Sequence, residues 1–198
     1  MGTGCRCRGG LALSVRVIAG SARGRRLRAP RQGVRPTADR VREAIFDVLD
    51  HLGVVEGANV ADVFAGTGAL GIEALSRGAA SATFVDADRD AVATINWNLE
   101  TTRLGSAKSR IVRADALAWC KSVTAPFDVA LVDPPYAFDR WRELLERLPA
   151  RLAVLESSYE VELAGPFVLH RVYRYGGTLV TVAVTSPSSS AAPGKEPE

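Results

Sequence analysis

Short apolar runs alternate with amphipathic segments through the middle of the chain. The runs expected to form buried strands are residues 59–64, 81–85, 108–112, 127–132 and 152–155. Between them, apolar residues recur with helical spacing over residues 69–77, 89–103, 115–123 and 140–148. Strand–helix alternation predicts an α/β fold with a parallel sheet and helices on both of its faces.

The C-terminal part of the pattern changes from alternating strands and helices to two consecutive strands. Residues 168–175 and 178–184 are separated only by Gly176-Gly177, which is typical of a hairpin. A parallel sheet tolerates an antiparallel addition at its edge. We therefore expect a Rossmann-like, seven-stranded, mostly parallel sheet with a C-terminal antiparallel hairpin.

The region before the first buried strand carries a different pattern. Residues 15–19 and 25–28 predict a short basic hairpin that turns around Gly24. A helix is predicted over residues 40–52, with Thr37 and Asp39 as suitable N-cap types after Pro36. We expect residues 15–58 to form an RNA-binding or cofactor-capping element on a catalytic core of residues 59–185. Residues 1–14 and the Ser- and Pro-rich residues 186–198 are expected to be disordered.

Charge is distributed unevenly along the chain. Residues 1–36 contain nine arginines and no acidic residue, although the net charge of the whole chain is only +3. The rest of the chain is therefore acidic. A basic arm on an acidic body indicates a polyanionic partner held at one end, and the alternative is a solvated, poorly ordered N-terminus.

The cysteines and the longest apolar runs bear on cellular location. Cys5, Cys7 and Cys120 form no disulfide framework, which favours a reducing compartment. Cys5 and Cys7 are followed by no second ligand pair, so we predict no metal site. No apolar run is long enough for a signal core or a membrane span, so the sequence predicts a soluble cytoplasmic protein.

Acidic residues lie at or near the carboxyl ends of four successive predicted strands, beside a glycine-rich turn. Gly66, Gly68 and Gly71 match a dinucleotide-binding fingerprint, which by itself leaves a NAD enzyme open. Asp62 would repel a pyrophosphate but could accept hydrogen bonds from a cationic amino-acid moiety. Asp86 suits ribose hydroxyls, and Asp115 suits an adenine amino group. The pattern favours S-adenosylmethionine, and the residues predicted to bind it are Thr37, Asp62, Ala65, Gly66, Gly68, Asp86 and Asp115.

Asp133-Pro134-Pro135-Tyr136 follows the fourth predicted strand and suggests the chemistry. An exocyclic base amine is a poor nucleophile unless acceptors hold its N–H groups and direct its lone pair at the methyl donor. The Asp133 carboxylate and the Pro134 carbonyl can be those acceptors, with Pro135 stiffening the backbone. Tyr136 offers a face for the planar base. The alternative is a Pro-Pro turn packed beneath a tyrosine.

At this point the residues resemble the 16S rRNA guanine-N2 methyltransferases of the RsmD type. The resemblance covers about residues 15–185, and its specific part is N-terminal. It is carried by residues 16–19, 22–25, 35–37, 40–46, 62–71, 73–79 and 133–136.

The resemblance implies a substrate that composition and spacing do not show. It is N2 of one guanine, of the guanine 966 type, in small-subunit rRNA within a 30S particle. We also expect a monomer. The residues expected to contact RNA phosphates are Arg16, Arg23, Arg25, Arg26, Arg28 and Arg35.

Three other functions remain open on the sequence. The chain could be another N-methyltransferase, acting on adenine N6 in DNA or RNA or on a protein glutamine. It could be a non-catalytic RNA-binding Rossmann module. A NAD-dependent dehydrogenase is the third alternative.

Overall fold

The computed structural model describes residues 15–29, 36–105 and 108–186. Our expectations for residues 1–14, for Arg35 and for residues 187–198 lie outside this part of the chain, and so do those for Cys5, Cys7 and the Thr37 side chain. Ser186, which we expected to be disordered, is described, and its N–H donates to the Pro166 carbonyl at 2.9 Å. None of the described helices is long and apolar enough to cross a membrane.

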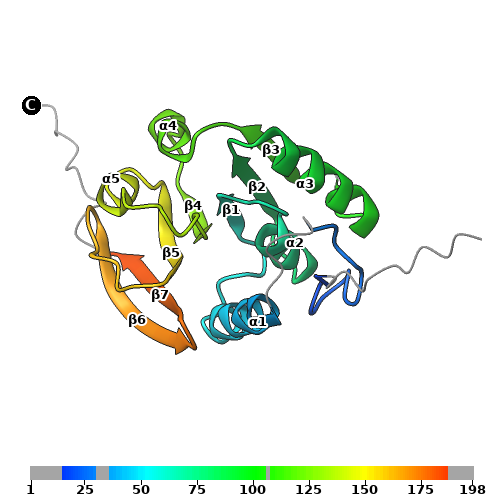
Figure 1. The fold of residues 1–198 in the computed structure, drawn as a ribbon, viewed down its shortest axis with the longest axis horizontal. Coiled ribbons are helices and arrows are strands. Elements are labelled where there is room, and N and C mark those ends of the chain that lie inside the picture. The colour runs from blue at the N-terminus through cyan, green and yellow to red at the C-terminus, as the bar shows by residue number, and fades with distance from the viewer. Residues whose placement is uncertain (1–14, 30–35, 106–107, 187–198) are drawn as a thin grey trace, which may run out of the picture.

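One seven-stranded sheet runs through the molecule in the order β3-β2-β1-β4-β5-β7-β6 (Figure 1). The five strands from β3 to β5 are parallel, and β7 is antiparallel to both of its neighbours. This confirms the predicted fold class, with β7 inserted between β5 and the edge strand β6. The strands are β1 (Asn59–Val63), β2 (Ser81–Asp86), β3 (Ser109–Arg113), β4 (Phe127–Val132), β5 (Ala150–Ser157), β6 (Phe167–Tyr175) and β7 (Thr178–Thr185).

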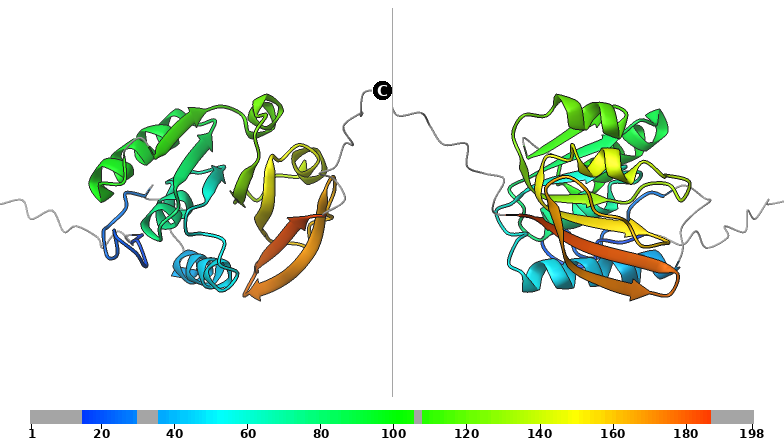
Figure 2. Two further views of the ribbon diagram at one scale, coloured as in Figure 1. Left: turned by 180° about the vertical axis from the view of Figure 1, so that it is seen from behind. Right: turned by 90° about the vertical axis from the view of Figure 1, so that its left-hand side faces the viewer.

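Helices cover both faces of this sheet (Figures 1 and 2). The helices are α1 (Pro36–His51), α2 (Ala69–Ser76), α3 (Arg89–Thr102), α4 (Ala116–Ser122) and α5 (Trp141–Leu145). Helices α4 and α5 pack on the face that carries Ala61, Val63 and Val132. Helices α1, α2 and α3 pack on the other face, against β-strand residues such as Val60 and Phe84. Alternate residues of the central strands therefore enter opposite cores, as expected for a sheet buried on both sides.

The basic N-terminal segment is a fixed loop with a single bridge rather than a full hairpin. Only Arg16 and Arg26 form a β-bridge. Pairing stops there because the next donors bond to α2 instead. The N–H groups of Ile18 and Ala19 donate to the buried Glu73 carboxylate at 2.8 and 2.9 Å. We name residues 15–29 the basic loop.

The first helix begins earlier than the sequence pattern predicted. It starts at Pro36 instead of residue 40, so our interpretation of Thr37 and Asp39 as N-cap residues is wrong. Proline suits the first helical position because its missing N–H would be unpaired there anyway. Asp39 lies within the first turn and pairs with Arg42 at 3.1 Å.

Candidate active site

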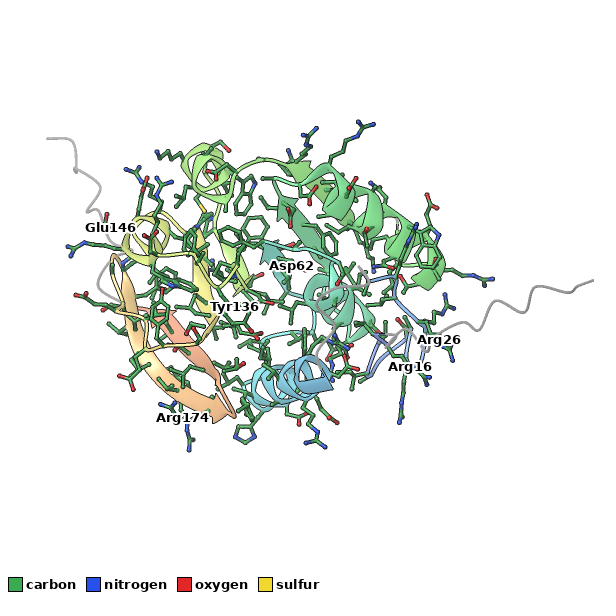
Figure 3. All side chains as sticks on the ribbon, viewed as in Figure 1. Arg16, Arg26, Asp62, Tyr136, Glu146 and Arg174 are labelled. Carbon is green, nitrogen blue, oxygen red and sulfur yellow. The ribbon has the colours of Figure 1, made fainter. Side chains whose placement is uncertain are left out.

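A cavity of about 720 Å³ opens at the carboxyl ends of the parallel strands. It lies where the strand order reverses between β1 and β4, which is where open α/β sheets bind ligands. Its acidic and basic side chains, among the residues that the structure describes, are six carboxyl groups and one guanidinium. They are Asp62, Asp86, Asp88, Asp115, Asp133, Glu156 and Arg42. Figure 3 shows Asp62 and Tyr136 near the centre of the molecule.

The glycine turn after β1 is fastened to the end of β2. The Gly66 N–H donates to Asp86 Oδ2 at 2.8 Å, and the Asp88 N–H donates to Asp86 Oδ1 at 2.9 Å. Each carboxylate oxygen keeps acceptor capacity, because an ionised carboxylate has about four acceptor sites. A Cβ added to Gly66 would lie no closer than 4.0 Å to the atoms around it, so the backbone here borders open space. Ala65 and Gly66 both line the cavity.

Gly68 shapes the turn but does not line the cavity. It is buried, adopts φ +74° and sits at the start of α2. A Cβ there would lie 3.2 Å from Ile95 Cγ1. Its conformation and its packing both favour glycine, so the structure places this predicted cofactor residue beneath the turn.

Asp62 is a buried carboxyl in the cavity wall. It is 1% exposed and accepts the Gly71 N–H at 2.8 Å. Burial raises its pKa to about 8, and the negative charges of Asp133 and Asp86 add to that effect against the hydrogen bond from Gly71. This group is therefore mostly neutral at pH 7 until a cation approaches it.

Asp115 lies after β3 and caps the next helix. Its Oδ1 accepts the Ala118 N–H at 2.9 Å at the start of α4. The residue is exposed and lines the cavity, so its carboxylate serves the helix and can still accept a bond from a ligand.

The four residues predicted to be catalytic lie together on the loop after β4. Asp133, Pro134, Pro135 and Tyr136 all line the cavity, and Tyr136 is 61% exposed. Asp133 as a whole residue is exposed to solvent. Its carboxyl group is nevertheless closely surrounded by protein atoms. This desolvation raises its pKa to about 6, so the carboxylate is predominantly ionised at pH 7.

An aromatic cluster supports this loop. It consists of Phe64, Phe138, Trp141 and Tyr159, and we name it the brace. The Phe138 ring packs edge-on against Phe64 at 5.1 Å and against Trp141 at 5.4 Å between ring centroids. The Tyr159 hydroxyl accepts the Trp141 indole N–H at 3.0 Å and donates to the Phe138 carbonyl at 2.8 Å. The Phe138 N–H in turn donates to the Pro135 carbonyl at 2.8 Å.

Sequence reasoning missed several residues that line or support the cavity. Glu156 lies at the carboxyl end of β5, so the strand-end rule that found the other acids would also have found it. Arg42 is 5% exposed on α1, where its spacing resembles that of a core residue. Its Nη2 donates to the Arg16 carbonyl at 2.6 Å, and its buried Nε has no hydrogen-bond partner. Nothing in the local sequence marks the members of the brace, because they come from three separate segments.

The arginines predicted to bind RNA lie on the basic loop and not in the cavity. Arg16, Arg23, Arg26 and Arg28 are exposed, and Arg25 is half-buried with its Nη1 bonded to the Thr101 carbonyl at 3.2 Å. The loop meets the cavity at both of its described ends, Val15 and Ala29. Figure 3 shows the labelled Arg16 and Arg26 together at the end of the molecule opposite Glu146.

The sheet order, the glycine turn and the site at the switch point define the class. The fold is that of the class I S-adenosylmethionine-dependent methyltransferases. Two solved members with under 25% identity share this fold. They are SMU.776 with bound SAH, at a TM-score of 0.59, and the magnesium protoporphyrin IX methyltransferase of Synechocystis with bound SAM, at 0.63.

The chain belongs to the RsmD-type family, described as "Conserved hypothetical protein 95", which matches residues 15–176. It is 43% identical over 123 residues to "Ribosomal RNA small subunit methyltransferase D" of Escherichia coli, a match that spans 62% of this chain and 60% of that protein. It is 37% identical over 183 residues to "Putative rRNA methyltransferase YlbH" of Bacillus subtilis, covering 85% of this chain and 97% of that protein. The solved structure titled "Putative methyltransferase yhhF from Escherichia coli" superposes with a TM-score of 0.76 at 35% identity, covering 87% and 98% of the two chains. The predicted resemblance is thereby confirmed.

Proposed function

We propose that this protein uses S-adenosylmethionine to methylate the exocyclic N2 of a guanine in small-subunit rRNA. The observation that carries the cofactor assignment is the charge of the cavity. Among the described residues, six carboxylates and one buried guanidinium line it. Such a wall suits a ligand with an ammonium, a sulfonium and a single carboxylate, and it would repel the two charges of a pyrophosphate.

The residues fit the parts of that cofactor. Asp86, held by two backbone N–H groups, would accept from the ribose hydroxyls, and Asp115 from the adenine amino group. Asp62 would face the ammonium, and the unpartnered Arg42 Nε is an unmet donor in the wall that must hold the carboxylate. The Ala65–Gly66 backbone borders the open space between these groups. For Thr37 we propose a place in the cap over the same site.

The target amine would be held by the loop after β4. S-adenosylmethionine, when bound, supplies an electrophilic methyl group on a sulfonium. Asp133 and the Pro134 carbonyl would accept the two amine hydrogens, and Asp133 would stabilise the positive charge that develops on nitrogen. Pro135 fixes the backbone, and the exposed Tyr136 face would stack on the base. The base must leave its stack to enter, so a loop or a flipped nucleotide is the substrate.

The RNA substrate follows from the relatives and from the basic loop. Two relatives are named as rRNA methyltransferases, one of them for the small subunit. Hydrogen bonds from the loop backbone to α2 hold the basic loop in place and leave four arginine side chains exposed for phosphates. We assign residues 15–58 to RNA binding and capping and residues 59–185 to catalysis. We propose a monomer that acts in the cytoplasm on rRNA within a 30S particle, at the guanine 966 type of position.

The test uses 30S subunits from a strain that lacks its own enzyme for this base. The protein is incubated with these subunits and labelled cofactor, and the methylated nucleoside is mapped. We expect a single N2-methylguanosine. Asp133→Ala should abolish transfer while cofactor affinity stays within about twofold, and Asp139→Ala, on the exposed end of the same loop, should retain activity. Label on adenine, or normal turnover by Asp133→Ala, would overturn the proposal.

A further inference from the structure

Trp97 is an exposed tryptophan on α3, a helix whose apolar residues Ile95 and Leu99 are buried. It is 42% exposed, whereas Trp119 and Trp141 are 6% and 5% exposed, and these are all the tryptophans of the chain. Helix α3 packs through Ile95, Asn98, Leu99 and Thr102. Trp97 lies off that face, so packing of the helix against the sheet does not account for the residue.

The basic loop is attached to α3 by contacts at Trp97 and at the residues close to it on the helix. The Arg28 guanidinium carbon lies 5.9 Å from the Trp97 ring centroid. The next residue, Asn98, fixes the Arg28 backbone in both directions, accepting its N–H at 2.7 Å and donating to its carbonyl at 3.1 Å. One turn further along α3, the Thr101 carbonyl holds Arg25. An aromatic face is thus kept beside two guanidinium groups on the surface.

The same contacts connect this surface to the candidate active site. Asn98 Nδ2 also donates to the Thr67 carbonyl at 2.8 Å, and Thr67 lines the cavity. Ala29, which follows Arg28, lines it too. An RNA strand that crosses Trp97 and the basic loop therefore reaches the cavity rim.

We infer that Trp97 and Arg28 form a stacking site for an unpaired RNA base, separate from the cavity that takes the target base. This rests on the proposed function for the identity of the ligand. A single strand fits because its bases are free to stack on an aromatic face and its phosphates complement the exposed Arg16, Arg23 and Arg26. The site would guide the strand next to the target without reading its sequence.

Tryptophan fluorescence of the whole protein tests the inference directly. Titration with a short single-stranded oligoribonucleotide should quench Trp97, whereas the two buried tryptophans should be unaffected. A duplex of the same length should bind through phosphates without quenching. Trp97→Leu should abolish the quenching and weaken single-strand binding by roughly tenfold, since one stacked base contributes on that scale. Trp97→Phe should keep most of the affinity, because a phenyl ring still stacks.

Leu169→Ala is the matched control, since Leu169 is an exposed apolar residue on β6, 57% exposed. It should leave RNA affinity unchanged. Binding without quenching, or equal affinity in Trp97→Leu, would show that Arg28 merely packs on the ring and would overturn the site. The measurement needs no methyl transfer. Quenching by a protein that fails to methylate 30S subunits would therefore refute the proposed function alone, and methylation without quenching would refute this site alone.

Discussion

The hydroxyl of Tyr159 donates a hydrogen bond to the carbonyl oxygen of Phe138 at 2.8 Å, and so ties the segment after β5 to the loop that carries Asp133. The same hydroxyl accepts the Trp141 N–H, and the Tyr159 carbonyl accepts the Ser157 hydroxyl at 2.6 Å. Phe138 is linked back to Pro135 through its own N–H. Tyr159 therefore acts on the loop from outside the cavity, as a positioning residue.

Tyr159→Phe is expected to lower kcat for methyl transfer by about tenfold without changing cofactor affinity. The ring stays, but the Phe138 carbonyl and the Trp141 N–H lose their shared partner. Each lost hydrogen bond destabilises the fold by about 0.5–1.5 kcal/mol, so the melting temperature should also fall. Misplacing the loop affects only the bound reactants, so the effect should appear in kcat more than in the KM for cofactor.

Tyr173→Phe on β6 removes a hydroxyl outside the brace and should leave kcat unchanged. If Tyr159→Phe lowered the melting temperature but kept kcat, the hydroxyl would have only a structural role.

The brace illustrates which parts of the molecule the sequence could predict. Periodicity predicted the sheet because each central strand is apolar on both faces, and strand-end acids predicted the cavity wall because parallel strands end at one edge. The bond from Tyr159 to Phe138 joins residues 21 positions apart, with α5 and β5 between them in the chain. No local pattern encodes such a contact.

The N-terminal segment shows a second reason why sequence-based prediction fails. Its turn residue and its charge were clear, but the predicted hairpin is one bridge, and the N–H groups of the segment that follows donate to Glu73 and Ser76 on α2. Glu73 was part of the quoted family motif, yet its burial and its partners depend on where the chain returns. Local propensity does not contain that information.

We expect the methyl-transfer rate at saturating cofactor to fall as the pH drops below about 6. Desolvation raises the pKa of Asp133 to about 6 in the free protein, and a bound sulfonium lowers it, so the carboxylate is ionised above pH 6 and becomes protonated below that pH. A protonated acid loses acceptor capacity and the charge that stabilises the developing cation, and kcat should fall about tenfold per pH unit. The pH profile of kcat in single-turnover assays measures this.

Asp133→Asn supplies the comparison, since it keeps the shape and cannot ionise. Its residual activity should be low and flat between pH 5 and 7. A step at or below pH 6 that persisted in this variant would assign the titration to another group.

Cofactor binding at pH 7 should release a proton from Asp62. The pKa of Asp62 is raised to about 8, so its carboxyl is mostly neutral at pH 7 in the free protein. A cation in the cavity favours the ionised form and lowers that pKa, which expels the proton. Calorimetry in two buffers with different ionisation enthalpies should report release approaching one proton at pH 7 and little at pH 9, where Asp62 is already ionised.

Asp62→Asn mimics the neutral acid and can still accept the Gly71 N–H. The variant should fold, bind cofactor more weakly and release no proton. Equal release by the wild-type protein and by Asp62→Asn would place the titrating group elsewhere in the cavity.

Replacing Arg23 and Arg26 by alanine should weaken RNA binding and flatten its salt dependence. Both side chains are exposed on a loop whose backbone is held by α2, so the substitutions should remove charge without unfolding the loop. Each lost phosphate contact lowers the slope of log affinity against log salt by about 0.7 for single-stranded RNA. Arg142→Ala with Arg151→Ala removes equal charge from α5 and β5, across the molecule from the basic loop (Figure 1). The control pair should change the slope far less. Equal slopes for the wild-type protein and for the Arg23 and Arg26 double variant would mean that the basic loop does not contact phosphate, and the RNA would then have to approach the cavity over another surface.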